Sequence, residues 1–137
     1  MKIAVAGVGY VGLVTAVTLA DVGHDVICLD VDKGKLKMLK EGISPIYEYG
    51  LEELMFKNRE RLEFTDDVTK YSEAQVIIIG VGTPEKEDGS ADLSAVFSVA
   101  DSIADNSSDG TVVVVKSTVP IGTCENVRRR IGERRPD

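Results

Sequence analysis

The chain has 137 residues, of which 43% are hydrophobic, and its 16 basic and 23 acidic side chains give a formal net charge of −7. This length fits one domain with a modest core, and the hydrophobic share excludes a disordered chain. The acidic balance argues against a nucleic-acid-binding protein, and no apolar run reaches the roughly 18 residues that a membrane span needs.

Strands and helices alternate in the first half of the chain. Residues 2–6 form a short run that is apolar after Lys2 and bounded by Gly7, which predicts a buried strand. After it, four apolar residues fall at the i, i+3, i+4, i+7 spacing of one helix face: Leu13, Ala16, Val17 and Ala20. Gly23 predicts the end of this helix. The elements expected next are a strand over 25–30, a helix over 32–42 that carries Leu36, Leu39 and Ile43 on one side, a helix over 51–58 and a strand over 61–65.

The second half repeats this alternation. Residues 75–82 include four consecutive β-branched apolar side chains, the pattern of a parallel strand that is buried on both faces. A helix is expected from Leu93 to Ala104, another buried strand over 111–116, and a helix over 124–131. The whole pattern predicts an α/β fold, a Rossmann-type doubly wound parallel sheet with helices on both faces.

Three glycines follow the first strand at the spacing G-x-G-x-x-G, which is typical of a dinucleotide site between a strand and a helix. Gly7 would permit the tight turn, Gly9 would let a diphosphate approach the backbone, and Gly12 would let the helix pack close to the strand. We expect the N–H groups of Tyr10 and Val11 to face the phosphates at the positive end of the helix.

Asp30 ends the second strand, 18 residues after Gly12. A carboxylate at this position can accept hydrogen bonds from both ribose hydroxyls and would repel a 2′-phosphate, so it favours NAD over NADP. The alternative is that the glycines serve only a turn and that Asp30 only caps a strand end. The combination of strand, glycine turn, helix and acid favours the NAD site.

Two further loops follow predicted strands at the edge of the sheet where ligands bind. Thr83 follows the strand over 75–82, and Thr118 follows the strand over 111–116. Their hydroxyls could bind ribose, nicotinamide or water, or they could cap the next helix or turn.

Several stretches resemble the UDP-glucose/GDP-mannose dehydrogenase family. They are residues 1–32, "ISPIYEYGLEEL", "VGTP" with "DGSADLSAV", and "KSTVPIGT", and together they extend the resemblance over essentially the whole chain. One departure is Tyr49, where bacterial members usually carry proline, and we expect only a local backbone difference there.

The resemblance implies oxidation of the C6 alcohol of a nucleotide sugar to a carboxylate with two NAD. It implies NAD contacts at Val11, Asp30, Lys35, Thr83 and Thr118, with Thr118 also near the reacting carbon in a supporting catalytic role. The family's nucleophilic cysteine has no counterpart here. Residues 1–137 are therefore expected to be an NAD-binding domain without the central helix and the UDP-sugar domain, inactive alone and part of a homodimer at full length.

The residues leave the substrate and the class of protein open. The run over 81–94 favours UDP-glucose, while GDP-mannose and UDP-N-acetylmannosamine stay possible within the family, and a non-catalytic NAD-sensing module is the alternative outside it. We expect a cytoplasmic protein of polysaccharide biosynthesis that binds neither nucleic acid nor a metal ion. Cys28 in a strand and Cys124 on the apolar side of the last helix are expected to be packing residues, and His24 an exposed one.

Overall fold

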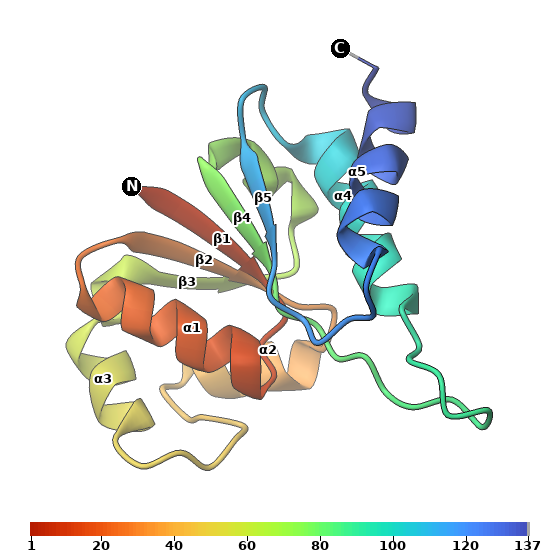
Figure 1. Cartoon of the computed structure of the whole chain (residues 1–137). Helices are drawn as coiled ribbons and strands as arrows, with labels where there is room; N and C mark the ends of the chain where they lie inside the picture. Colours follow the sequence, from red (N-terminus) through yellow and green to blue (C-terminus); the bar gives the residue numbers. More distant parts are fainter. Residues whose placement is uncertain (137) are drawn as a thin grey trace.

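The computed structural model describes residues 1–136 and contains one five-stranded parallel sheet. Its strand order is β3-β2-β1-β4-β5 (Figure 1). The strands are β1 (Lys2–Ala6), β2 (Asp25–Leu29), β3 (Leu62–Thr65), β4 (Val76–Ile79) and β5 (Val112–Val115). β1 pairs with β2 on one side and with β4 on the other, so successive strands are added first toward one edge of the sheet and then toward the other. Doubly wound folds bind their ligands at the point where the strand order switches in this way.

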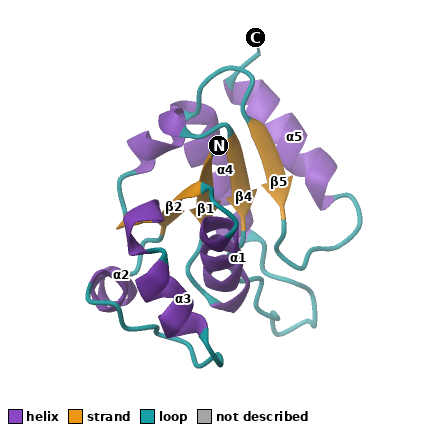
Figure 2. Ribbon diagram, turned by 90° about the vertical axis from the view of Figure 1, so that its left-hand side faces the viewer, coloured by secondary structure: helices purple, strands orange, loops and turns teal. Residues whose placement is uncertain are grey.

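Helices cover both faces of this sheet, so the fold class expected from the sequence is confirmed (Figure 2). The α-helices are α1 (Tyr10–Asp21), α2 (Lys33–Lys40), α3 (Leu51–Lys57), α4 (Ser94–Asn106) and α5 (Thr123–Arg134). The first three helices pack on one face of the sheet, and α4 and α5 lie side by side on the opposite face.

The core has two halves, one on each side of the sheet, because successive strand residues point to opposite faces. In β1, Ile3 and Val5 pack toward α1 and α3, whereas Ala4 and Ala6 pack toward α4. The helix face expected after the glycines is also buried, namely Leu13, Ala16, Val17 and Ala20.

The expectation of full burial was wrong for β5. Val113 and Val115 pack against the α4–α5 layer, but Val112 and Val114 are 57% and 40% exposed on the other face. β5 is the edge strand farthest from α1–α3, so this second face has no helix over it. In β4, Ile77 and Ile79 are buried and their neighbours are half-buried.

Three local features differ from the sequence prediction. Two 3₁₀ helices, Arg59–Arg61 and Val68–Glu73, were not expected. α2 ends at Lys40, so Ile43 lies beyond the helix and is 45% exposed. Gly42 has a positive φ of 81° just after this helix, which is the left-handed conformation typical of a helix stop.

Candidate functional site

The turn after β1 depends on Gly7. Its φ is +103°, a conformation that residues with a side chain rarely adopt, and its N–H donates to the Leu29 carbonyl at 2.7 Å. A Cβ on Gly7 would lie 2.7 Å from the carbonyl oxygen of Gly80, at the end of β4. Glycine is therefore required here both by the turn and by the close approach of two strand ends.

Gly9 and Gly12 have opposite surroundings. A Cβ on Gly12 would lie 1.9 Å from the Gly7 carbonyl oxygen, so the start of α1 packs directly on the turn. A Cβ on Gly9 would meet no atom within 4 Å. The packing role expected for Gly12 is thus confirmed, and Gly9 faces open space in front of the helix.

The N-terminus of α1 carries no side-chain cap and no acidic residue in its first turn. The first N–H groups of any helix lack partners within the helix, and the helix dipole adds partial positive charge to them. Here those groups belong to Gly9 and to the first helical residues Tyr10, Val11 and Gly12. This terminus, beside the open space at Gly9, can accept an anion.

Asp30 lies directly after β2 and faces the glycine turn. Its Oδ2 accepts the Val8 N–H at 2.8 Å, and its Oδ1 accepts the Asp32 N–H at 2.8 Å. The carboxylate therefore fixes the turn, and each oxygen keeps a lone pair for a further donor such as a ribose hydroxyl. The structure brings Asp30 and the glycine turn together, as a dinucleotide site requires.

Lys35 lies in the first turn of α2. Its backbone N–H donates to Oδ1 of Asp32, the N-cap of that helix, at 3.1 Å, and its side chain is half-buried. Within residues 1–136 the Lys35 side chain makes no hydrogen bond, so only its backbone is tied to the start of α2.

The loops that carry Thr83 and Thr118 are joined. The Thr83 hydroxyl donates to the Thr118 carbonyl at 2.7 Å, so it does not cap a following helix. Next to it, the buried Ser117 hydroxyl donates to the Val81 carbonyl at 2.7 Å. Both bonds fix the loops after β4 and β5 at the same edge of the sheet as the glycine turn.

Sequence reasoning missed Gly80 and Tyr71. A Cβ on Gly80 would lie 3.2 Å from the Gly12 Cα, so this glycine also allows the close contact between β4 and α1. A glycine directly after an apolar strand could have been recognised from the sequence as a position of close backbone contact. Tyr71 is only 2% exposed, and burial together with the negative charge of Asp30 raises the pKa of its hydroxyl. No local pattern pointed to this tyrosine.

The two cysteines lie in different surroundings. Cys28 is fully buried in β2, and burial raises the pKa of its thiol to about 12, which keeps it protonated and inert. Cys124 was expected on the buried side of the last helix, but it is exposed, while Val127 one turn later is buried. The Cys124 prediction was wrong because the buried face of α5 carries Thr123 and Val127, four residues apart, and Cys124 lies beside this face. His24, expected to be exposed, is half-buried.

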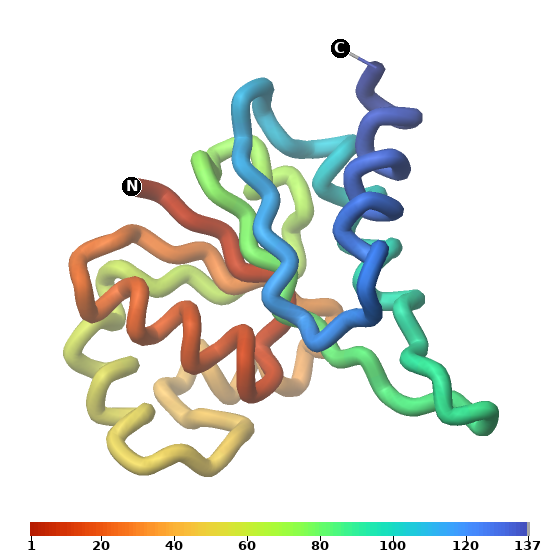
Figure 3. Tube along the Cα trace, in the orientation of Figure 1, coloured from red at the N-terminus to blue at the C-terminus, as the bar shows by residue number. Residues whose placement is uncertain are grey.

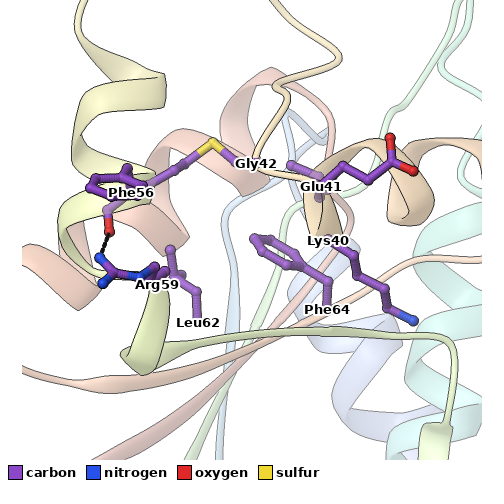
Figure 4. Close-up of a pocket in the computed structure, with 9 residues that line it drawn as sticks. Lys40, Glu41, Gly42, Phe56, Arg59, Leu62 and Phe64 are labelled. Atoms are coloured by element: carbon purple, nitrogen blue, oxygen red, sulfur yellow. Dashed lines mark hydrogen bonds between the residues drawn. The ribbon is translucent and has the colours of Figure 1, made fainter.

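A cavity of about 420 Å³ lies away from these residues (Figure 4). It opens between the end of α2, the end of α3 and the start of β3. Its lining residues are Leu39, Lys40, Glu41, Gly42, Met55, Phe56, Arg59, Leu62 and Phe64. None of the residues expected to contact NAD lines it, so this cavity is separate from the site at the glycine turn.

A glycine turn, an uncapped helix terminus and an acid at the end of β2 define a Rossmann-type dinucleotide-binding domain. The chain belongs to the UDP-glucose/GDP-mannose dehydrogenase family, whose NAD-binding domain matches residues 1–137. The resemblance inferred from the sequence is thereby confirmed, as is NAD as the cofactor of this domain.

Individual relatives agree with this assignment. A UDP-glucose 6-dehydrogenase of Rhizobium meliloti is 51% identical over 140 residues, covering 99% of this chain and 32% of the relative. A UDP-glucose dehydrogenase from Pyrobaculum islandicum matches with a TM-score of 0.88 and 38% identity, over 97% of this chain and 32% of that one. A GDP-mannose dehydrogenase from Pseudomonas aeruginosa, solved as a ternary complex, matches with a TM-score of 0.92 and 37% identity, over 100% and 33%.

The chain spans about a third of the length of the curated relatives it matches. In the part of the chain that the structure describes, residues 1–136, no helix has the length and apolar character needed to cross a bilayer.

Proposed function

We propose that the glycine turn and the adjoining strand ends form the NAD site of this domain. The residues that would bind the cofactor are Gly7, Gly9, Tyr10, Val11, Gly12, Asp30, Lys35, Thr83 and Thr118. One observation carries the proposal: the open space at Gly9 lies directly before an uncapped helix terminus, with the Asp30 carboxylate hydrogen-bonded to the same turn.

The residues present fit a dinucleotide. The N–H groups of Tyr10 and Val11 would bind the diphosphate, and the free lone pairs of Asp30 would accept the adenosine ribose hydroxyls. The loops of Thr83 and Thr118 would hold the other half of the cofactor, with Thr118 supporting the reaction near the oxidised carbon. When bound, NAD supplies the nicotinamide ring that accepts a hydride.

For the whole protein we propose oxidation of UDP-glucose to UDP-glucuronate with two NAD, in the cytoplasm and as a homodimer, for polysaccharide biosynthesis. Support comes from relatives named UDP-glucose 6-dehydrogenase, at 51% and 48% identity. The structural match to a GDP-mannose dehydrogenase favours a second candidate substrate, since it is about as similar as the match to a UDP-glucose dehydrogenase.

The test is calorimetric titration of the 137-residue chain with NAD and with NADP. We expect NAD to bind and NADP to bind at least about tenfold more weakly, because Asp30 repels a 2′-phosphate. Equal affinity for the two coenzymes, or binding of neither, would refute the site. In an absorbance assay with UDP-glucose and NAD, the chain alone should form no NADH, since the family's nucleophilic cysteine has no counterpart in it.

A further inference from the structure

Tyr10 makes a contact that the NAD site does not explain. It is the first residue of α1, its side chain is 56% exposed, and its hydroxyl donates to Oε2 of Glu48 at 2.6 Å. Glu48 belongs to the loop over 41–50 between α2 and α3, which passes beside the N-terminal end of α1 (Figure 3). The hydrogen bond therefore joins this loop to the turn that we propose binds the diphosphate.

The backbone that carries Glu48 is itself well supported. The Ser44 N–H donates to Oε1 of Glu52 at 3.0 Å, and the Ser44 hydroxyl donates to the Ile46 carbonyl at 2.7 Å. Ile46 packs against the core beneath α1, and the Leu51 N–H donates to the Glu48 carbonyl at 3.2 Å as α3 begins. Glu48 thus presents its carboxylate from a fixed loop.

We propose that Glu48 is a positioning residue for NAD, which acts by holding Tyr10 and the first turn of α1 in the geometry that binds the diphosphate. This inference rests on the proposed NAD site. A hydrogen bond from a phenol to a carboxylate is charge-assisted and stronger than a neutral one. Because the bond exists before the cofactor arrives, part of the ordering that binding requires is already complete.

The titration behaviour of Tyr10 agrees with a lasting bond. Its hydrogen bond to Glu48 and the negative charge of that carboxylate raise the pKa of the Tyr10 hydroxyl. The hydroxyl therefore keeps its proton, and its ability to donate, throughout the neutral range.

The test compares NAD affinities of variants of the 137-residue chain by calorimetry. We expect Tyr10→Phe and Glu48→Ala each to weaken NAD binding about fivefold, the effect of losing one hydrogen bond. The double variant should bind no more weakly than either single variant, because both changes remove the same bond. Glu48→Gln keeps an acceptor oxygen and should bind within about twofold of the wild type.

Tyr47→Phe is the matched control, because Tyr47 lies in the same loop with a side chain that is 92% exposed. It should leave NAD affinity unchanged. Melting temperatures without NAD should agree among all variants, since Tyr10 is largely exposed; a parallel loss of thermal stability and affinity would indicate a merely structural bond and overturn the proposal.

The same titrations distinguish a missing positioning role of Glu48 from a missing NAD site. If the wild type binds NAD and the two single variants bind equally well, or if their effects add in the double variant, Glu48 has no positioning role. If the wild type does not bind NAD, the proposed site itself is refuted, and this inference with it.

Discussion

The Val8 N–H donates to Oδ2 of Asp30 at 2.8 Å, and this bond connects the glycine turn after β1 with the end of β2. The second carboxylate oxygen holds the Asp32 N–H at the N-cap of α2. Asp30 therefore has a structural role in the turn in addition to the ribose contact that we propose. Substitutions at this position must separate the two roles.

Replacing Asp30 with Asn changes the charge and removes one acceptor while the size of the side chain is kept. We expect NAD affinity to fall about tenfold, because hydrogen bonds to a charged group are worth about 1.5–3 kcal/mol. NADP affinity should fall less or rise, since the repulsion of the 2′-phosphate is lost. Calorimetry with both coenzymes measures the ratio.

Asp105→Asn is the control for Asp30→Asn, because it removes the same charge from α4 in the other helix layer. It should leave the affinity ratio of NAD to NADP at the wild-type value. A wild-type ratio in Asp30→Asn itself would show that this carboxylate does not select the coenzyme.

The glycines at 9 and 12 should respond oppositely to alanine. Gly12→Ala places a Cβ 1.9 Å from the Gly7 carbonyl oxygen, a backbone atom, so we expect the free energy of unfolding to fall by about 3 kcal/mol. Gly9→Ala meets no atom within 4 Å, so stability should stay within about 0.5 kcal/mol of the wild type.

NAD affinity should separate the two roles, because the variant that keeps its stability, Gly9→Ala, is expected to lose binding. Gly9→Ala, although stable, should lose at least about tenfold in NAD affinity, because its Cβ occupies the space that the diphosphate needs. Urea unfolding and calorimetry on the same samples check both quantities. If Gly9→Ala binds NAD as tightly as the wild type, the diphosphate does not lie at Gly9.

The parallel sheet and the roles of Gly7 and Gly12 were predictable because they follow from local rules. Apolar periodicity decides which residues form strands and helices, and a missing Cβ decides where a turn can be tight. The exposed face of β5 was not predictable in the same way. Val112 and Val114 have the residue types of a buried strand, and only the strand order places them at an uncovered edge.

The contacts within the site were partly predictable. The sequence placed Thr83 and Thr118 after neighbouring strands, so their proximity followed from the parallel sheet. The hydrogen bond between them spans 35 residues, and the bond from Tyr10 to Glu48 spans 38. Such bonds depend on strand register and loop path, which no local pattern specifies.

Thr83→Val tests the connection between the two loops. It removes the hydroxyl that donates to the Thr118 carbonyl at 2.7 Å while the side chain keeps its shape. We expect a loss of about 1 kcal/mol in the free energy of unfolding and a severalfold loss of NAD affinity, since both loops border the proposed site. Thr83→Ser keeps the hydroxyl and should preserve both quantities. If Val and Ser variants behave alike, the bond does not matter for either property.

Glu73 should make stability depend on pH in a defined window. Hydrogen bonds from Lys2 and Lys70, the latter at 2.9 Å, lower the pKa of its carboxyl from 4.5 to about 2. A lowered pKa in the folded chain means that the stabilisation is complete above pH 4.5 and is lost as the pH falls from there to about 2.

Glu73→Gln should therefore be less stable than the wild type at pH 7, and the difference should shrink as the pH falls to about 2, where half of the wild-type carboxyls are protonated, and disappear below it. Urea unfolding at a series of pH values measures this difference. Glu87→Gln, in the exposed loop after β4, removes an equal charge and should show no such dependence. NAD affinity at pH 7 should be the same in both variants, because Lys2 and Glu73 lie at the amino ends of the strands, opposite the glycine turn. A constant stability difference across the whole pH range would show that Glu73 contributes by packing and not by its charge.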